Sequence, residues 1–141
     1  MRLTAFTDFG LRALMRLAGE PERSFTTDEI AREFAISRHH LIKVVRRLAD
    51  AGYVRTQRGA GGGFQLARPA QSITLGEVVR DLEADQPIVE CFRTDGGNCV
   101  LTPRCRLKKR LAMAREAFLR ELDATSLADC AYPASPRRKA A

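Results

Sequence analysis

The chain has 141 residues, a formal net charge of +7 and a sequence pI of about 9.8. This length allows one domain, or one domain with an appendage, and the positive charge suits a polyanionic partner. No stretch approaches the roughly eighteen apolar residues that cross a bilayer, and the N-terminus has no charged segment followed by an apolar one. We therefore expect no membrane span, no secretory signal and a cytoplasmic location.

Charge is distributed unevenly along the chain. Residues 51–68 contain three arginines and no acid, whereas residues 69–90 contain five acids and one arginine. Positive charge returns between residues 104 and 110. The ordinary explanation of such a run is a solvated surface, and we prefer it for the C-terminal segment 137–139.

Two short helices are predicted first. Leucines and a methionine at helical spacing indicate a helix over residues 7–18, which the Gly-Glu-Pro sequence at 19–21 ends. A second helix begins at Thr26, whose spacing from Glu29 is that of a capping box, and it stops near residue 36. This helix is expected to bury Ile30, Ala31 and Phe34.

A third helix is predicted over residues 38–51, capped by Ser37 and closed by Gly52. Its inner face is formed by Leu41, Val44, Val45 and Leu48. A helix, a short turn and a second helix that carries cations form a helix-turn-helix, so this is the candidate recognition helix. Its outward side chains are Arg38, His39, His40, Lys43, Arg46 and Arg47. The first of these would approach base edges and the later cations would bind phosphates. The two histidines point roughly 100° apart, so we assign neither as a metal ligand.

A β-hairpin is predicted next, with strands at residues 53–57 and 64–67 joined by the glycine-rich turn 58–63. Glycines let the backbone approach a phosphate closely, and Arg55 and Arg58 add charge. No Gly-Lys-Ser/Thr ending follows these glycines, which argues against an ATP-type phosphate loop. Three helices followed by a basic hairpin predict a winged helix-turn-helix that binds double-stranded DNA. The candidate DNA-binding residues are Thr27, Ser37, Arg38, His39, His40, Lys43, Arg46, Arg47, Arg55, Arg58, Gly59, Gly61 and Gly62.

The rest of the chain is predicted to be two helices around a loop. A helix covers residues 75–82, capped by Ser72 or Thr74, and Pro87 prevents its continuation. After the loop, a long helix carries an apolar stripe close to heptad spacing, made of Leu107, Leu111, Ala114, Phe118 and Leu122. In so small a chain this stripe is expected to pack against a second copy as well as against its own domain, which gives a homodimer.

The predicted fold class is therefore mainly α with a small β wing, a winged helix-turn-helix plus a long dimerisation helix. We divide the chain into a DNA-binding domain at residues 1–70, a cysteine loop with the dimerisation helix at residues 71–130, and a flexible basic tail at residues 131–141.

Three of the four cysteines, Cys91, Cys99 and Cys105, lie in the loop before the long helix. In the cytoplasm such cysteines are poor disulfide candidates and better metal or redox candidates. Their spacing is too open for a zinc knuckle with paired Cys-x-x-Cys units. Soft thiolates suit an iron–sulfur cluster, which normally has four protein ligands. The fourth ligand could be water, a small molecule, Cys130 or a residue of a partner chain.

Together these segments resemble a known family, the winged-helix iron–sulfur regulators, and within it the nitric-oxide-sensing repressors. The resemblance covers residues 1 to about 130. The segments that carry it are Met1-Arg-Leu-Thr-Ala-Phe-Thr-Asp-Phe, Ser37-Arg-His-His-Leu-Ile-Lys-Val-Val-Arg-Arg-Leu, Arg58-Gly-Ala-Gly-Gly-Gly, Val89-Glu-Cys-Phe and Cys99-Val-Leu-Thr-Pro-Arg-Cys105-Arg-Leu-Lys. Lys108 stands where another branch of the family has a histidine ligand, which favours the nitric-oxide-sensing branch.

The resemblance implies a cytoplasmic homodimer that binds promoter DNA while its iron–sulfur cluster is intact and releases the DNA when nitric oxide damages the cluster. It assigns Cys91, Cys99 and Cys105 as cluster ligands and the partner subunit's Asp8 as the fourth. Without the resemblance, Asp8 would be an ordinary partner of a helix dipole. Arg12, one helical turn further, is expected to pair with it. A four-iron (4Fe-4S) cluster is favoured, and a two-iron (2Fe-2S) cluster remains an alternative because the first cysteine spacing is long.

Two other functions remain open at this stage. The same scaffold could sense redox or iron–sulfur status, or the chain could be a zinc-stabilised nucleic-acid-binding module. An enzyme is not expected, because the sequence has no Ser/His/Asp set, no paired catalytic carboxylates and no nucleotide loop.

Overall fold

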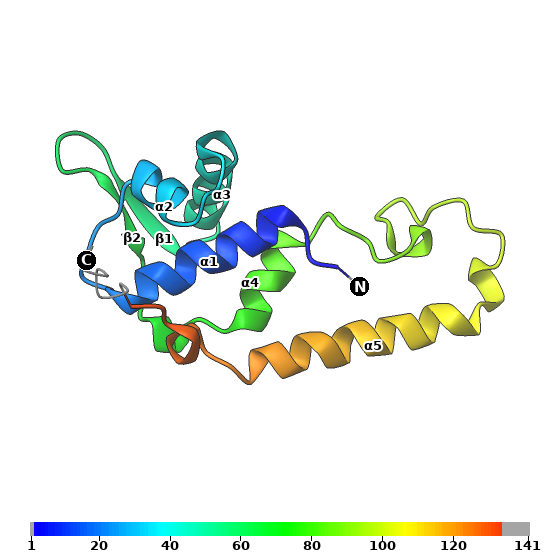
Figure 1. Ribbon diagram of the computed structural model, residues 1–141. Coiled ribbons are helices and arrows are strands. Elements are labelled where there is room, and N and C mark those ends of the chain that lie inside the picture. Colours follow the sequence, from blue (N-terminus) through cyan, green and yellow to red (C-terminus); the bar gives the residue numbers. More distant parts are fainter. Residues whose placement is uncertain (1, 134–141) are drawn as a thin grey trace, which may run out of the picture.

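Five α-helices and one two-stranded sheet make up the part of the chain that the computed structural model describes, residues 2–133 (Figure 1). In chain order they are α1 (Ala5–Gly19), α2 (Thr27–Glu33), α3 (Arg38–Asp50), β1 (Val54–Gln57), β2 (Gly63–Leu66), α4 (Leu75–Leu82) and α5 (Arg106–Asp123). The elements up to α4 form a body, from which α5 extends as a long arm. The predicted fold class, mainly α with a small β wing, is confirmed.

The core lies where the first three helices pack together. All four residues predicted for the inner face of α3 are buried. α1 is longer than predicted because Thr4 begins it: the Thr4 hydroxyl accepts a hydrogen bond from the Thr7 N–H at 3.2 Å. α2 begins with the predicted capping box between Thr26 and Glu29. Phe34 is half-buried rather than buried, because it lies just beyond the last residue of α2.

The wing is an antiparallel hairpin with Val54 opposite Leu66. Its second strand begins at Gly63, one residue before the predicted start, and the backbone of Phe64 bridges to that of Phe25 through hydrogen bonds of 2.8 and 2.9 Å. A Cβ on Gly63 would lie 2.4 Å from the Phe25 carbonyl oxygen, so only glycine allows this close approach. The base of the wing is therefore fixed to the helical core, while residues 58–61 at its tip are exposed.

α4 has the predicted bounds, and Thr74, one of the two expected caps, begins it with a hydrogen bond from the Glu77 N–H. The helix ends at Leu82, before Pro87, as predicted. The chain leaves the helical path at Glu83, whose side chain bonds to the N-terminal segment.

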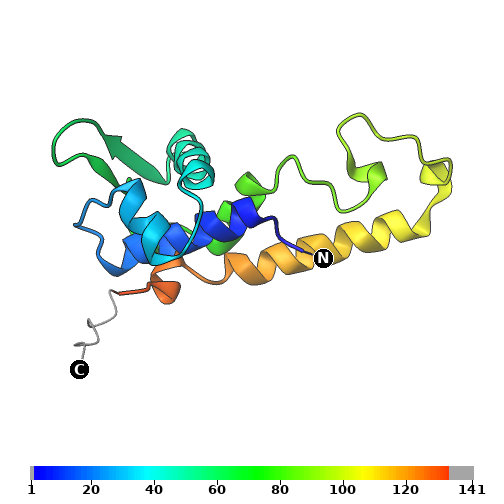
Figure 2. The ribbon, with the colours of Figure 1, turned by 45° about the horizontal axis from the view of Figure 1, so that its top comes forward.

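Only the C-terminal part of α5 packs on the body, where Leu119 is buried. Of the predicted apolar stripe, Leu111, Phe118 and Leu122 are half-buried, whereas Ala114 is exposed and Leu107 is 62% exposed. The first half of α5 thus projects from the body (Figure 2). Packing of this stripe against a second copy stays a prediction.

After α5 the chain returns to α1. The Tyr132 N–H donates a hydrogen bond of 2.8 Å to the Met15 carbonyl oxygen, so residues 131–133, which the sequence places in the tail, lie against α1. Residues 134–141, including the basic segment 137–139, lie outside the described part. Within residues 2–133, no helix is both long enough and apolar enough to cross a membrane.

Candidate nucleic-acid interface and metal centre

The outward face of α3 carries all the side chains predicted for it. Arg38, His39, His40, Lys43, Arg46 and Arg47 are exposed, on the side opposite the buried stripe. Two of them already have partners: Arg38 pairs with Asp28 on α2 at 2.5 Å, and Arg47 donates to the Asp81 carbonyl oxygen at 2.9 Å. Within residues 2–133, Lys43 and Arg46 make no ion pair, so their charges face solvent or a ligand. The two histidine rings lie 6.2 Å apart and are tilted by 49° to each other.

Two hydroxyl residues flank this face. Ser37 is the N-cap residue of α3, but its side chain makes no capping hydrogen bond, so its hydroxyl is left exposed. Thr27, the first residue of α2, is half-buried. Such hydroxyls at helix starts, beside free N–H groups, can bind a phosphate oxygen.

The tip of the wing is shaped by its glycines. Gly59 and Gly61 have φ angles of +94° and +74°, and a Cβ on Gly62 would lie 2.5 Å from the Gln57 carbonyl oxygen. Arg58 is exposed at this tip, and Arg55 lies on β1 opposite Gln65. The hairpin therefore presents backbone and a cation together, as a wing that follows a DNA backbone would.

α4 connects this interface to the rest of the chain. Each of its charged residues, together with Glu83 at its end, bonds to a different element. Glu77 bonds to Arg68 after β2, and Arg80 bonds to Asp123 on α5. Asp81 bonds to Tyr53 before β1, and Glu83 bonds to Thr4 and Thr7 at the start of α1. These contacts were not predicted from the sequence. The acidic composition of residues 69–90 was the only signal of them.

The Tyr53 contact joins the base of the wing to α4. Its hydroxyl donates to the Asp81 carboxylate at 2.5 Å, and its ring is buried. The pKa of Tyr53 is raised well above its usual range, mainly by burial and secondly by the hydrogen bond to Asp81. The hydroxyl therefore stays a donor at any physiological pH. The base of the wing is thereby locked to α4.

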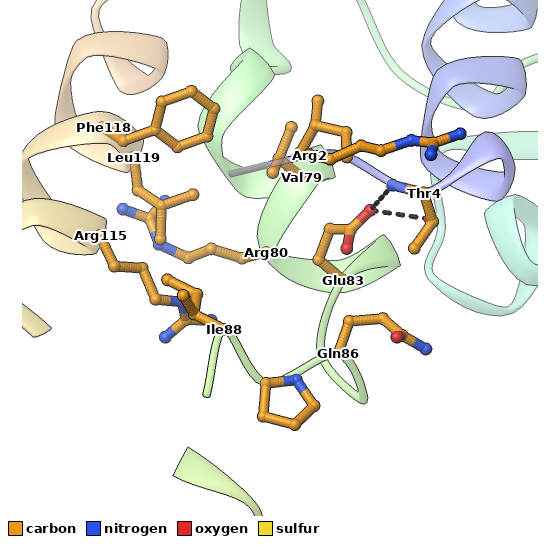
Figure 3. Close-up of a pocket in the computed structure, with 12 residues that line it drawn as sticks. Arg2, Thr4, Val79, Arg80, Glu83, Gln86, Ile88, Arg115, Phe118 and Leu119 are labelled. Atoms are coloured by element: carbon orange, nitrogen blue, oxygen red, sulfur yellow. Dashed lines mark hydrogen bonds between the residues drawn. The ribbon is translucent and has the colours of Figure 1, made fainter. Parts of the chain in front are cut away.

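The same helix meets the N-terminus beside a cavity. Arg2, Thr4, Glu83 and Arg115 contribute to the walls of this space of about 200 Å³ between the N-terminal segment, α4 and α5 (Figure 3). Glu83 accepts hydrogen bonds of 2.8 Å from both the N–H and the hydroxyl of Thr4. The start of α1, which carries Asp8, is therefore fixed to the residue from which the cysteine loop departs.

The cysteine loop is closed by Glu90. Its carboxylate accepts a hydrogen bond of 2.8 Å from the Asn98 N–H, which joins the residues directly before Cys91 and Cys99. Gly97 has a φ of +61°, and a Cβ there would lie 2.7 Å from the Glu90 carbonyl oxygen. The segment between Cys91 and Cys99 is thus folded back on itself, because a glycine at position 97 allows the close contact with Glu90.

All three loop cysteines are free thiols and half-buried. The Cys105 sulfur caps α5 by accepting the Lys108 N–H at 3.4 Å. In residues 2–133, no three His, Cys, Asp or Glu side chains are close enough together to hold a metal ion. The folded chain therefore does not by itself gather the predicted ligand set.

The loop nevertheless fits an iron–sulfur cluster in its donor chemistry. It offers three soft thiolates, one of them at a helix start, and the buried hydroxyl oxygen of Thr102, between Cys99 and Cys105, has no hydrogen-bond partner. A bound sulfide or thiolate could accept from that hydroxyl.

Asp8 lies on the first turn of α1 with its carboxylate half exposed. The predicted pair with Arg12 is confirmed, with distances of 2.7 and 3.1 Å between the guanidinium and the carboxylate. The Asp8 carboxylate is therefore held at the surface by an ion pair within one turn of α1. A more tightly bound cation could replace Arg12 in this pair.

Comparisons with known proteins agree with this architecture. A family model for Rrf2, described as an iron-dependent transcriptional regulator, matches residues 3–133. The HTH-type transcriptional regulator NsrR of Geobacillus kaustophilus (strain HTA426) is 48% identical over 130 residues, which are 92% of this chain and 88% of that protein.

Solved structures of similar fold include CymR, the global cysteine regulator of B. subtilis. It is 31% identical with a TM-score of 0.73, over 93% of this chain and 96% of that one. The oxidized form of Staphylococcus aureus CymR is 27% identical with a TM-score of 0.71, over 96% and 99% of the two chains. IscR of T. potens is 25% identical with a TM-score of 0.70, over 92% and 85%.

Proposed function

The chain belongs to the Rrf2 family of iron-dependent transcriptional regulators, and we propose that it is a repressor that holds promoter DNA while an iron–sulfur cluster is bound and releases it in response to nitric oxide. It is a DNA-binding regulator with a winged helix-turn-helix and not an enzyme. We propose, in addition, the nitric oxide signal, the cluster type, the ligand set, the homodimer, the division into domains and a cytoplasmic location.

The observation that carries the proposal is the position of α4. Through Tyr53 and Arg47 it holds the wing and the recognition helix, and at Glu83 it passes directly into the loop that carries the three cysteines. A change in the loop therefore acts at the end of the one short helix that fixes both DNA-reading elements. A coupling of only about 2–3 kcal/mol would change DNA affinity by roughly a hundredfold.

The cluster would be held by Cys91, Cys99 and Cys105 of one subunit and by the partner subunit's Asp8. When bound, the group supplies iron that reacts with nitric oxide. The four-iron form is favoured. Asp8 is suited to its role because its carboxylate is half exposed and, within residues 2–133, forms its one ion pair with Arg12 of the same helix.

A homodimer would bring these ligands together. The first half of α5 projects from the body with Leu107 and Met113 each more than half exposed, and Val100 and Leu101 beside it are exposed as well. Burial of such side chains against the same face of a second copy would be favourable by roughly 1.5–3 kcal/mol for each large side chain. In that dimer one subunit's loop would have to lie beside the other subunit's α1, because the proposed ligands come from both.

Cysteine variants test the proposal. Cys99→Ala, purified without oxygen, is expected to lose the brown colour and to bind operator DNA no better than the metal-free parent protein. Cys130→Ala, a half-buried thiol outside the loop, is the matched control and should behave as the parent does. Operator DNA can be selected by the coloured protein from a random-sequence duplex pool.

Three results would redirect the assignment. A colourless parent protein that contains zinc would favour a structural zinc module. A coloured protein that responds to oxidants but not to nitric oxide would favour a sensor of redox or iron–sulfur status. Full operator binding by colourless Cys99→Ala would remove the cluster from the switch.

A further inference from the structure

Ile42 is a large apolar side chain that the recognition helix exposes. Its exposed fraction is 42%, whereas the other large apolar side chains of α3 are buried. In residues 2–99 it is the one large apolar side chain exposed to this degree, and the others in the described part follow residue 99. Because it is apolar, the charge pattern that marked its neighbours did not include it.

The position of Ile42 on the helix places it among the cations. Successive residues of a helix turn by roughly 100°, so His39, Ile42, Lys43 and Arg46 share one face. All four are exposed, and they lie opposite the buried stripe of α3. Ile42 therefore lies within the surface assigned to DNA and not at its margin.

Contacts inside the chain hold the two edges of this face. Arg38 pairs with Asp28 on α2 at 2.5 Å, and Arg47 donates to the Asp81 carbonyl oxygen on α4 at 2.9 Å. α5 lies along the opposite side of the body from α3 (Figures 1 and 2). The strip between the two arginines is therefore oriented by α2 and α4, and α5 of the same chain does not cover it.

Ile42 serves neither the helix nor the core. Because its side chain is β-branched, it forms helix less readily than leucine, lysine or arginine. A single exposed apolar side chain is common on a protein surface and needs no partner in the free protein. On this face, however, the side chain leaves water when the helix enters a groove, so its apolar area contributes to affinity in the DNA complex.

The major groove offers one apolar group to such a side chain. Guanine, cytosine and adenine present hydrogen-bonding atoms there, whereas thymine adds its 5-methyl group. Against the other bases, isoleucine would take a donor or acceptor out of water without replacing its hydrogen bond. Ile42 is the fifth residue of α3, in the N-terminal part of the helix that approaches base edges.

We propose that Ile42 is a specificity-determining residue that packs against the 5-methyl group of a thymine in the operator. The neighbouring cations would bind phosphates or base acceptors, while Ile42 selects thymine by apolar contact alone. This inference rests on the operator binding of the proposed function, but not on its nitric oxide signal or on the arrangement of a dimer.

Removal of single methyl groups from the DNA tests this contact. The operator is first selected by the coloured protein from a random-sequence pool under nitrogen. Each thymine is then replaced in turn by deoxyuridine, which lacks only the 5-methyl group. At the thymine that Ile42 contacts, the affinity of the parent protein is expected to fall by about fourfold, the value of one buried methyl group. Ile42→Ala should bind more weakly than the parent and should not distinguish thymine from deoxyuridine at that position.

Two variants serve as controls. Ile42→Val keeps a branched side chain and should retain the preference for thymine. Lys43→Gln, at the adjacent exposed residue, should weaken binding while leaving the ratio of affinities for the two DNAs unchanged. Equal responses of the parent and Ile42→Ala at every thymine would overturn the inference, as would an operator in which no methyl group affects the parent.

Failure of the proposed function would give a different result. A coloured parent that selects no common sequence would overturn both proposals. Operator that stays bound in nitric oxide would overturn only the proposed function, since the methyl comparison uses no nitric oxide. Because Ile42 is exposed, Ile42→Ala should unfold in urea no more readily than the parent, so a lost preference for thymine reports the contact and not the fold.

Discussion

The hydroxyl of Tyr53 donates a hydrogen bond of 2.5 Å to the carboxylate of Asp81, which joins the base of the wing to α4. The carbonyl oxygen of the same aspartate accepts a hydrogen bond from Arg47 on the recognition helix. One residue of α4 therefore holds both elements that read DNA.

Removing this hydroxyl should weaken the protein and its switch. Tyr53→Phe is expected to lower the free energy of unfolding by about 1–2 kcal/mol, because the buried donor to a charged acceptor is lost. Urea unfolding measures this. The ratio of DNA affinities with and without the cluster should also fall. Tyr132→Phe is the control, since this tyrosine is 43% exposed and its hydroxyl has no hydrogen bond within residues 2–133. Equal unfolding free energies for the two variants would contradict the prediction.

Stability at acid pH should depend on the contact between α4 and α5. The Arg80 guanidinium holds the pKa of Asp123 below its ordinary value of 3.8. Because the folded pKa is the lower one, this contribution is fully present above about pH 3.8 and is lost as the pH falls through the folded value. The urea midpoint of Asp123→Asn should therefore lie below that of the parent at pH 7 and approach it below pH 3.8. Asp50→Asn, at an exposed residue, should match the parent throughout.

Closure of the cysteine loop by Glu90 should matter for metal retention. Glu90→Ala removes the acceptor of the Asn98 N–H, so we expect iron affinity to fall by about tenfold or more, as for other residues that orient ligands. Iron loss to a chelator under nitrogen measures this. Glu121→Ala, at an exposed residue near the C-terminal end of α5, is the control. Identical rates of iron loss would show that the hydrogen bond does not organise the ligands.

Asp8 and the loop cysteines should differ in their effects. Any of Cys91→Ala, Cys99→Ala and Cys105→Ala is expected to abolish the colour. Asp8→Ala should keep a cluster with an altered spectrum or lower stability, because three thiolates remain. Anaerobic absorbance spectra of the four variants check this. An unchanged spectrum for Asp8→Ala would exclude this carboxylate as a ligand, and a colourless one would show that three thiolates are insufficient.

Local sequence patterns were sufficient for most of the fold. The bounds of α4, the capping box of α2, the inner face of α3 and the Asp8–Arg12 pair all depend on residues a few positions apart, and each was predicted. Spacing alone did not show that Glu83 would bond to Thr4 and Thr7, because these partners are more than seventy positions away.

The contacts that organise the candidate site were harder to predict for the same reason. Tyr53 and Asp81 are 28 positions apart, and neither belongs to a motif that carries chemistry. The three cysteines were singled out by residue type, yet within residues 2–133 they are not gathered with one another or with a fourth ligand. If that ligand comes from a second subunit, neither one sequence nor one folded chain contains the complete site.

The central claim is that DNA binding depends on a cluster that nitric oxide disrupts. The most direct measurement is an anaerobic titration of the coloured protein with nitric oxide, in which cluster absorbance and the anisotropy of labelled operator DNA are recorded in the same cuvette. We predict that both signals fall together over the same range of nitric oxide. Loss of the cluster absorbance while the DNA remains bound would contradict the account.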